Sequence, residues 1–414
     1  MKQDWEIKKL GEVCTFANGY AFQSKEYTED GYFVIRIGNV QDGYIELNNP
    51  RYIKLSEEKQ KKFILSEGDV LVSLTGNVGR VGEIKVEHLP AVLNQRVAKI
   101  SLSSKSLHKA YLFYFLTSNY FIAELTKAGR GAAQQNISTT DIENLIIPLP
   151  SLSEQQRIVA ILDEAFAAIA KAKANAEKNL QNARELFESY LEGVFVGSKG
   201  SSSDREEWEE RTLEKLTDEK CSLSYGIVQP GEEYENGLPI VRPTDLTGRF
   251  IKIERLKRIN PKLADGYKRT KLIGDELLLC VRGTTGSISI ATPELRDANV
   301  TRGIVPIRFN SSLISQEFGY YLLISNFIQK QIKAKTYGTA LMQINIGDLR
   351  LLRILYPPLK QQQSIVRQLD TLRTETQKLE AMYQKKLEDL EELKKSILQK
   401  AFSGELTNIK MNVS

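Results

Sequence analysis

Two glycine-rich turns carry side chains of the types that bind nucleic acids. Thr75-Gly76-Asn77-Val78-Gly79-Arg80 lies in the first half of the chain, and Arg282-Gly283-Thr284-Thr285-Gly286 lies in the second. Glycine lets the backbone approach a partner closely. Asn, Arg and Thr side chains donate hydrogen bonds to phosphates and base edges. Neither turn has the Lys-Ser/Thr pair of a P-loop or the GxGxxG spacing of a dinucleotide-binding turn, so we reject nucleotide binding.

Two further pairs of segments offer similar chemistry. Arg can read guanine, and Asn or Gln can read adenine. For any one loop a plain surface turn is the commoner structure, but recurrence at equivalent positions favours a binding role. The paired segments are Asn94-Gln95-Arg96 with Thr301-Arg302, and the stretch containing Arg130, Gln134 and Gln135 with the stretch containing Lys335, Tyr337 and Gln343.

Positive charge is concentrated in residues 249–271, where nine Lys and Arg residues face two acidic residues. The whole chain has a net charge of only +5. Contact with DNA phosphates needs local positive density of this kind. Arg255, Arg258, Lys268 and Arg269 are therefore further candidates for DNA contact, and the alternative is a solvated basic face.

Catalytic patterns are weak by comparison. Asp69 with Glu83 and Lys85 resembles the acid-acid-lysine set of metal-dependent nucleases, but the second half has no counterpart, and chance is the better explanation. Both histidines lie in the first half, and the three cysteines are not clustered, so we expect no metal site. Tyr356-Pro-Pro-Leu359 lacks the side-chain acceptor of an amino-methyltransferase motif. We expect no active site and no bound cofactor in this chain.

The chain contains one plan twice, at an offset of 207 residues. The segment 152–163 recurs at 359–370 with the same Leu, Gln-Gln, Ile-Val and Leu-Asp, and the only two tryptophans open the two copies. Prolines close each body before the repeated segment. We expect bodies at 1–150 and 208–357, helices at 151–195 and 358–402, a flexible Gly/Ser linker at 196–207 and a tail at 403–414.

Short β-rich runs and a helix in each body predict an α+β fold. The expected strands are 32–37, 69–74 and 96–102 in the first body and 238–242, 276–281 and 304–309 in the second, and the expected helices are 109–126 and 316–335.

The two long helices have the period of a coiled coil. A four-three alternation from Ile158 is apolar at nine of ten positions, and the one from Ile365 at eight of ten. This period predicts that the helices pack on each other, and a pseudo-twofold axis between the copies would make them antiparallel. With the helices centred on each other, Asn179 would meet Thr376 as a polar pair that fixes the register, and Lys386 would face Ile169. No apolar run is long enough to span a membrane, and we expect a cytoplasmic protein.

The order of body, helix, body, helix resembles the specificity subunit of type I restriction-modification systems, as do Pro148-Leu-Pro-Ser-Leu-Ser-Glu-Gln-Gln-Arg-Ile158 and Tyr356-Pro-Pro-Leu-Lys-Gln-Gln-Gln-Ser-Ile365. The resemblance covers essentially the whole chain. It implies that each body is a target recognition domain reading one half of a split, asymmetric DNA site. The helices would set the spacing and dock two methyltransferase subunits, which motor-nuclease subunits then join. S-adenosylmethionine would lie on the methyltransferase partner, and ATP and magnesium on the motor-nuclease partner.

Two other classes of function stay open at this point. The first is a coiled-coil scaffold that binds proteins without DNA. The second is a standalone metal-dependent nuclease built on Asp69, Glu83 and Lys85. DNA binding that weakens steeply with salt would exclude the scaffold, and the absence of magnesium-dependent cleavage would exclude the nuclease.

Overall fold

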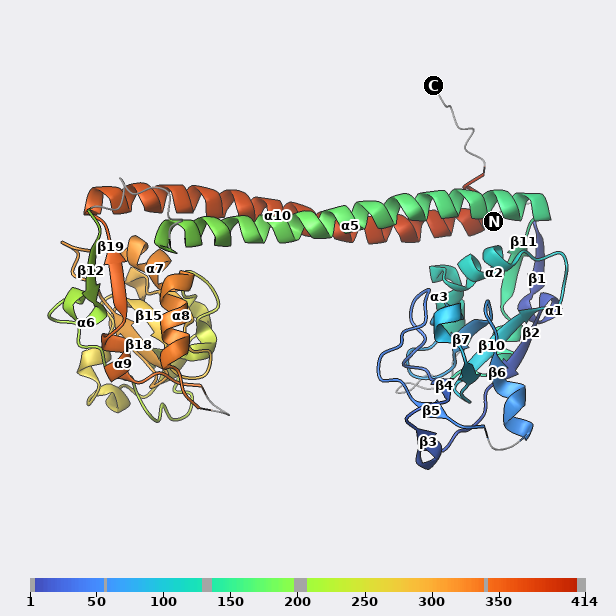
Figure 1. The fold of residues 1–414 in the computed structure, drawn as a ribbon, viewed down its shortest axis with the longest axis horizontal. Helices are drawn as coiled ribbons and strands as arrows, with labels where there is room; N and C mark the ends of the chain where they lie inside the picture. The colour runs from blue at the N-terminus through green and yellow to red at the C-terminus, as the bar shows by residue number, and fades with distance from the viewer. Residues whose placement is uncertain (1–3, 56–57, 129–135, 197–206, 339–341, 408–414) are drawn as a thin grey trace, which may run out of the picture. The chain divides into compact units, whose positions relative to one another are not determined.

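The computed structural model describes residues 4–55, 58–128, 136–196, 207–338 and 342–407. Contacts divide the chain into two units, one formed by Met1–Glu177 with Gln384–Ser414 and the other by Lys178–Tyr383. Each unit contains one globular body, the start of one long helix and the end of the other (Figure 1). Most of the expected linker, residues 197–206, lies outside the described residues.

The body of the first unit mixes short strands and helices. In chain order these are β1 Glu6–Lys9, α1 Leu10–Val13, β2 Cys14–Asn18, β3 Tyr27–Thr28, β4 Tyr32–Ile35, β5 Tyr52–Ile53, β6 Ile64–Leu65, β7 Val70–Ser73, β8 Val81–Glu83, β9 Ala91–Leu93, β10 Val97–Leu102, α2 Lys109–Leu116, α3 Asn119–Ala128, α4 Thr139–Glu143 and β11 Ile146–Leu149.

A four-stranded antiparallel sheet, in the order β2-β10-β7-β8, forms the middle layer of this body. Val70 and Val72 of β7 pack in one core cluster with α2 and α3, whereas Leu71 packs in another with β4 and β9. This alternation is the two-residue period of a strand buried on both faces. The five-stranded sheet β3-β5-β4-β9-β6, in which β4 and β9 run parallel, forms the outer layer.

The body of the second unit repeats this construction. Its elements are β12 Glu209–Thr212, α6 Leu213–Leu216, β13 Leu238–Val241, β14 Lys257–Ile259, β15 Leu277–Cys280, β16 Ile288–Ile290, β17 Asn299–Val300, β18 Ile304–Ile307, α7 Gln316–Ile324, α8 Asn326–Lys335, α9 Ile346–Arg350 and β19 Arg353–Tyr356.

The second body has the same layers. Leu277 and Leu279 of β15 pack with α7 and α8, and Leu278 packs on the opposite face with β13 and β17. The helices α7 and α8 cover the sheet β16-β15-β18 in Figure 1. The expected α+β fold with two similar bodies is confirmed.

Each of the expected helices, 109–126 and 316–335, is a pair of shorter helices in the structure, α2 with α3 and α7 with α8. The first pair breaks at Ser118 and the second at Ser325. Both serines are buried, and each hydroxyl donates to the carbonyl three residues earlier, at 2.6 Å. Ser118 Oγ also accepts from the backbone N–H of Phe121 at 3.2 Å. Each serine thus ends one helix, because its side chain competes with the backbone for hydrogen bonds, and Ser118 also caps the next helix, whereas the Ser325 side chain makes no capping hydrogen bond to α8.

The long helices are α5, Leu152–Val196, and α10, Leu359–Ser403. A buried glutamine ties the first turn of each helix to its own body. Gln155 donates to the carbonyls of Ser106 and Pro150 and accepts from the N–H of His108, all at 2.8 Å. Gln362 makes the same three contacts in the second unit, with Leu313, Pro357 and Ser315.

In each unit the start of one helix packs beside the end of the other, so the two helices are antiparallel. Ile158 and Leu162 share a core with Leu398 and Phe402 in the first unit. In the second unit the start of α10 shares a core with the end of α5, and Arg184 of α5 pairs with Glu380 of α10 at 3.2 Å. The predicted antiparallel coiled coil is confirmed.

The predicted register of the coiled coil is wrong. Thr376 is buried but donates to the carbonyls of Leu372 and Arg373 in its own helix, and no hydrogen bond to Asn179 is formed within the described chain. Lys386 is exposed. Side-chain pairs such as Phe187 with Arg373 lie several residues away from the centred alignment. The reason is that the first turn of each helix packs on its own body through Gln155 or Gln362, which staggers the helices.

The four-three alternation also fails near the helix ends. Leu186 and Leu393 were expected in the seam but are 51% and 47% exposed. The buried side chains there follow a four-residue spacing instead, as in Phe187, Leu191 and Phe195. At these ends each helix packs on a body as well as on the other helix, so the buried stripe follows the straight 3.6-residue helix and not the 3.5-residue supercoil.

Candidate nucleic-acid interface

Three loops of the first body meet where the strands β4, β7 and β9 end. Asn94, after β9, donates its backbone N–H to Ile35 O of β4 at 3.2 Å, and Leu74, after β7, donates to Arg96 O at 3.0 Å. Because β4 and β9 run parallel, their carboxyl ends lie at one edge of the body. The structure therefore brings two of the predicted segments together, the turn at 75–80 and the segment 94–96.

A cavity of about 470 to 600 Å³ opens at this edge in each body. The cavity of the first body, about 600 Å³, is predominantly polar and includes Arg36, Asn39, Asn48, Asn94, Gln95 and Arg96. Gln95 and Arg96 are exposed, while Asn94 is buried and its Oδ1 accepts from the N–H of Arg96 at 3.4 Å. Amide and guanidinium groups that converge on one hollow have the chemistry needed to read base edges.

Arg36 is a site residue that sequence reasoning missed. Its Nη2 donates to Asn49 O at 2.7 Å, and its backbone N–H donates to Asn39 Oδ1 at 3.1 Å. Its Nε is buried without a hydrogen-bond partner in the described chain. The available signal was an arginine directly after a buried strand in both copies, since Arg242 follows β13 in the same way.

The glycine turn of the first body contributes less than expected. Asn77 is exposed and free to reach a ligand, but Arg80 turns back onto the body. Its Nη1 donates to Gln41 Oε1 at 2.6 Å, and its Nε lies 3.7 Å from Asp42 Oδ1. Arg130, Gln134 and Gln135 lie outside the described residues.

The second body builds the same edge from different side chains. Thr301 donates its backbone N–H to Val241 O at 2.9 Å, and Val281 donates to Gly303 O at 2.8 Å, which joins the three loops. Arg282 Nε and Thr301 Oγ1 are buried without a protein partner in the described chain, as are Arg36 Nε and Thr75 Oγ1 in the first body. Arg302 is exposed. Buried polar groups are normally paired, so this concentration of unpaired donors indicates a surface that is completed by a ligand.

Arg242 differs from Arg36 in having an acidic partner. Its Nε and Nη2 donate to both carboxylate oxygens of Asp245, at 3.1 and 3.0 Å. Hydrogen bonding to Asp245 raises the pKa of Arg242. The pair is a fixed, two-point contact.

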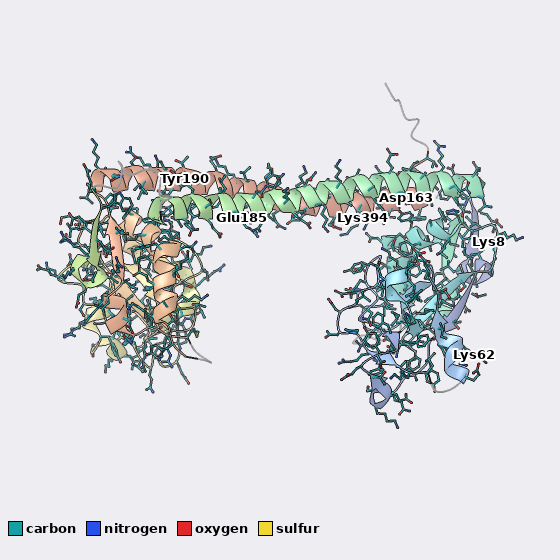
Figure 2. The ribbon with its side chains drawn as sticks, in the orientation of Figure 1. Lys8, Lys62, Asp163, Glu185, Tyr190 and Lys394 are labelled. Atoms are coloured by element: carbon teal, nitrogen blue, oxygen red, sulfur yellow. The ribbon has the colours of Figure 1, made fainter. Side chains whose placement is uncertain are left out.

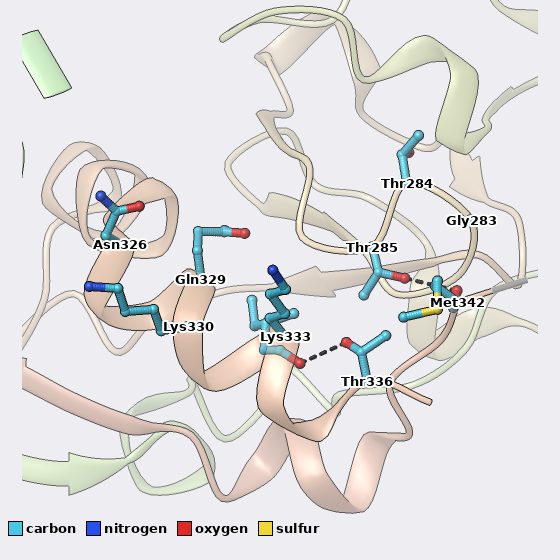
Figure 3. Close-up of a pocket in the computed structure, with 10 residues that line it drawn as sticks. Gly283, Thr284, Thr285, Asn326, Gln329, Lys330, Lys333, Thr336 and Met342 are labelled. Atoms are coloured by element: carbon cyan, nitrogen blue, oxygen red, sulfur yellow. Dashed lines mark hydrogen bonds between the residues drawn. The ribbon is translucent and has the colours of Figure 1, made fainter. Parts of the chain in front are cut away.

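Figure 3 shows the cavity of the second body, about 470 Å³, between the turn 283–285 and α8. Thr285 donates to Met342 O at 2.9 Å, and Gly283 N–H donates to the same carbonyl at 2.9 Å, so the turn is fixed to the loop after α8. Lys330 and Lys333 of α8 line the opposite wall. Sequence reasoning missed both lysines, because they lie inside the expected helix 316–335 and not in one of the repeated turns.

The remaining candidates of the second body lie around this loop. Tyr337 is 49% exposed, and its backbone exchanges two hydrogen bonds of 2.9 Å with Gln343. Thr284 is exposed and lies 3.5 Å from Cys280 Sγ. Lys335 pairs loosely with Asp348 at 3.7 Å. The turn and the loop thus present Thr284, Tyr337 and Lys333 on one side of the body.

The basic run does not form one surface. Arg255 is exposed, and Arg258 donates to Gly237 O at 3.1 Å. Lys268 and Arg269 line a separate cavity, with Arg308 and Glu276, at the other end of β15 and β18 from Arg282. Lys268 and Arg269 therefore lie apart from the loop cluster, and contact of these four residues with DNA stays a prediction.

The residues of the suggested nuclease do not assemble. Asp69 lies 3.4 Å from Lys99 Nζ, and Glu83 lies 2.6 Å from Lys109 Nζ, so each acid has a lysine partner of its own. In the described part of the chain no three His, Cys, Asp or Glu residues are grouped as metal ligands. None of the helices in that part of the chain combines the length and the apolar character needed to cross a membrane.

The chain is similar to specificity subunits of type I restriction enzymes over nearly its full length. It is 25% identical to the EcoBI specificity subunit of Escherichia coli, covering 97% of this chain and 86% of that one. It is also 25% identical to a putative MjaX specificity subunit of Methanocaldococcus jannaschii, covering 98% and 94%.

Two solved structures share the fold. One, from work on complex assembly and conformational transition of the type I R-M system, aligns with a TM-score of 0.77 at 20% identity over 98% of this chain and 99% of that chain. The other, the HsdS subunit from Thermoanaerobacter tengcongensis, aligns with a TM-score of 0.61 at 21% identity over 98% of both chains. The family model for the type I restriction modification DNA specificity domain matches residues 2–178 and 205–389. Since these two matches cover both copies of the repeat, the protein belongs to the family of type I restriction-modification DNA specificity proteins.

Proposed function

We propose that this chain is the DNA sequence-recognition subunit of a type I restriction-modification complex and that each body reads one half of a bipartite, asymmetric DNA site. One observation carries the proposal. The same strand-end loop cluster is built twice, and in both bodies it holds buried polar atoms without a protein partner. A scaffold that bound only proteins through its helices would have no use for two such edges.

The two clusters differ in the way that two different half-sites require. The corresponding segments of the repeat differ, because the first body has Asn77 and Asn94-Gln95-Arg96 where the second has Thr284 and Thr301-Arg302. Amides suit adenine and arginines suit guanine. We assign base contact to Asn77, Gln95, Arg96, Arg36, Thr284, Arg302 and Tyr337, and phosphate contact to Lys330, Lys333, Arg255 and Arg258.

Catalysis would belong to partner subunits. In this proposal two methyltransferase subunits, carrying S-adenosylmethionine, dock on the long helices, and motor-nuclease subunits that use ATP and magnesium join them in the cytoplasm. Apolar side chains available for such docking include Leu186 and Leu393, which are 51% and 47% exposed. The chain alone should therefore neither methylate nor cleave DNA.

Matched arginine variants test whether each body reads one half of the DNA site. Arg96→Ala should relax recognition in one half of the methylated site, and Arg302→Ala should relax it in the other half. Each loss of a two-point base contact should cost about 1–3 kcal/mol of discrimination. Mapping methylated adenines, with the methyltransferase partner present, reports both halves at once. If either variant altered both halves, the bodies would not read independently.

The helices would set the gap between the half-sites. Inserting one heptad after Ala176 of α5 and another after Tyr383 of α10 preserves the buried face of both helices. Seven residues add about 10 Å of helix, which corresponds to roughly three base pairs at 3.4 Å each. We expect the mapped gap to lengthen by that amount while both half-sites stay the same. An unchanged gap with intact methylation would refute this role of the helices.

A further inference from the structure

A second cavity in the body of the second unit lies away from the loop cluster. Its volume is about 430 Å³. It lies where β18 ends at Arg308 and β15 begins after Glu276, whereas Arg282 and Arg302 lie beyond the opposite ends of the same strands. From residue 276 to residue 282 a strand spans roughly 20 Å. A group bound in this cavity is therefore not part of the base pairs that the loops would read.

The lining of this cavity is strongly basic. It contains six Lys or Arg residues and only two carboxylates, those of Glu276 and Asp297. Asp297 lies 2.8 Å from Lys271 Nζ, and this contact lowers the pKa of Asp297. Of the residues that the structure describes, none forms an ion pair with the other exposed cations of the lining. These are Lys220, Lys268, Arg269 and Arg296.

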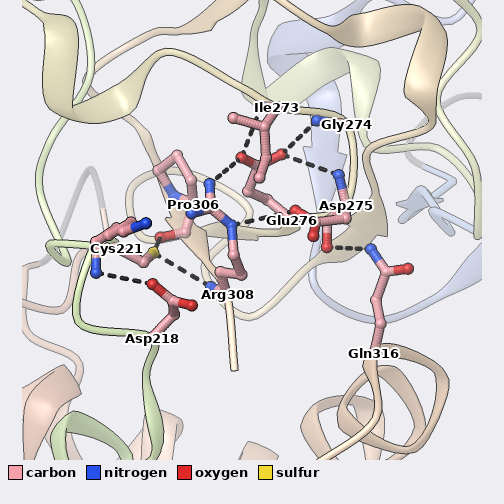
Figure 4. Close-up of polar contacts among 10 residues, drawn as sticks. Asp218, Cys221, Ile273, Gly274, Asp275, Glu276, Pro306, Arg308 and Gln316 are labelled. Carbon is pink, nitrogen blue, oxygen red and sulfur yellow. Dashed lines mark hydrogen bonds and ion pairs between the residues drawn. The ribbon is translucent and has the colours of Figure 1, made fainter. Parts of the chain in front are cut away.

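The second carboxylate, Glu276, is already satisfied (Figure 4). It is 1% exposed and accepts from the backbone N–H groups of Ile273 and Gly274, at 2.8 and 3.0 Å. Arg308 Nη2 donates to it at 2.7 Å, and Arg308 Nε donates to Asp275 at 3.1 Å. The inner wall is thus a rigid, neutralised pair, and the four outer cations keep their charge unbalanced.

The fold does not need all of these cations. At the offset of the repeat, Lys268 and Arg269 correspond to lysines of the first body, Lys61 and Lys62, but Lys220 corresponds to Val13, Arg296 to Leu89 and Arg308 to Ser101, and the first body forms the same layers. The neighbouring thiols Cys14 and Cys221 match, so the alignment holds at this place. Clustered like charges repel one another and destabilise the compact state unless an anion joins them.

We propose that this cavity binds a phosphate group, separately from the DNA held at the loop cluster. Guanidinium groups such as those of Arg269 and Arg296 take phosphate oxygens in two-point contacts, and the two lysines add charge. The phosphate belongs either to DNA that extends beyond the recognised site or to a free phosphorylated compound. This inference goes beyond the proposed function, because it concerns a site that reads no bases.

Pyrophosphate binding to the full chain tests the proposal, with isothermal titration calorimetry at low salt as the measurement. The double variant Lys220→Ala/Arg296→Ala should bind pyrophosphate at least fivefold more weakly than the wild type. The matched control is Lys215→Ala/Lys252→Ala, which removes two exposed lysines of the same body outside both cavities and should leave the titration unchanged. Equal loss in both variants, or no measurable binding by the wild type, overturns the proposal. Thermal denaturation of each variant verifies folding, and the Glu276–Arg308 wall is left intact.

Duplex length distinguishes the two sources of phosphate. Duplexes that end at the site are compared with duplexes that extend well beyond the second half-site. If DNA is the source, extension strengthens binding of the wild type and not of Lys220→Ala/Arg296→Ala. If a free compound is the source, extension has no effect while pyrophosphate binding persists. Failure of the chain to distinguish target from non-target duplex, with pyrophosphate binding intact, would count against the proposed function and not against this site.

Discussion

The two bodies join their long helices in different ways. In the second unit Arg249 closes the junction. Its Nη1 lies 2.5 Å from Asp370 of α10, and its guanidinium lies 5.2 to 5.3 Å from the ring centres of Tyr321 and Tyr320. At the offset of the repeat the first unit has Asp42, which faces Arg80 within its own body.

Without an arginine there, the junction of the first unit contains a cavity of about 410 Å³. Tyr44, Phe113, Tyr114 and Phe166 line it, and Lys394 lies 5.4 Å from the centre of the Phe166 ring. Figure 2 shows Lys394 and Asp163 on the two helices of this unit. In the first unit the ring, Phe166, lies on the helix that starts there. In the second unit the helix that starts there, α10, carries the cation, Arg373, and the helix that ends there, α5, carries the ring, Phe187.

Beneath this difference the framework of the junction is shared. Tyr114 donates to Asp163 and Tyr321 donates to Asp370, residues that match at the offset of 207. Burial raises the pKa of both tyrosines, so their hydroxyls remain protonated donors. Both bodies therefore contact the long helices through the same Tyr–Asp hydrogen bond, and the second body adds the Arg249 ion pair that the first body lacks. Because this junction is separate from the loop cluster, the loop residues of the two bodies can differ while the junction is kept.

Substitution of the buried glutamines Gln155 and Gln362 should cause the largest loss of stability, and the loss should be equal in the two units. Gln155→Ala or Gln362→Ala removes three hydrogen bonds and leaves buried backbone groups unpaired. At about 1 kcal/mol for each bond, the local free energy of unfolding should fall by about 3 kcal/mol. Hydrogen exchange measured by mass spectrometry should show the loss in α2 for the first variant and in α7 for the second.

The adjacent exposed glutamines are the controls for this experiment. Gln156→Ala and Gln363→Ala should stay within about 0.5 kcal/mol of the wild type, because both side chains are exposed. A loss confined to one of the two units would show that the shared framework is not equally important in both.

Arg249 should give a smaller effect that is confined to one unit. Arg249→Ala removes an ion pair and cation–π contacts, and Asp370 is 41% exposed, so solvent reduces the loss to about 1–2 kcal/mol. Asp42→Ala, the matched change in the first unit, should cost less than about 0.5 kcal/mol, because Asp42 is 75% exposed. Hydrogen exchange in α10 near Asp370 and in α5 near Asp163 is the measurement. Equal losses in the two variants would contradict the prediction that Arg249 stabilises its junction more than Asp42 does.

The repeat, the two bodies and the antiparallel helices could be predicted because they depend on patterns within short segments or on one constant offset. The helix register could not, because Gln155 and Gln362 set it through contacts with residues 47 to 49 positions away. The breaks at Ser118 and Ser325 were missed because apolar residues continue past them. Serine followed by asparagine was the only local sign.

The structure brings two of the predicted segments together in each body, since strand ends in layered bodies meet, but their contact with DNA stays a prediction. The contacts of Arg80 with its own body could not be predicted, because its partners, Gln41 and Asp42, come from a distant loop. The distance of Lys268 and Arg269 from the loop cluster could not be predicted either, because charge counted along a sequence does not show which end of a sheet a loop covers.

Protonation of His88 should cause the smallest loss of stability, and this loss is expected in the first unit only. It is buried in the first body, where Leu295 occupies the matching position of the second. Its Nδ1 accepts from the N–H of Lys85 at 2.9 Å, a contact that needs an unprotonated nitrogen. Burial lowers the pKa of His88 below its ordinary 6.5, although Glu87 partly opposes the shift.

Because the unfolded chain then binds the proton more tightly than the folded one, the stabilisation is complete above pH 6.5 and is lost as the pH falls from there through the lower pKa of the folded state. Between pH 7 and pH 5 the first unit should therefore lose more stability than the second. His88→Leu, which copies the second unit, should abolish this difference while leaving the acid response of the carboxylates. Hydrogen exchange at both pH values, corrected for intrinsic rates, is the measurement. A difference that persisted in His88→Leu would assign the pH response of the first unit to other groups.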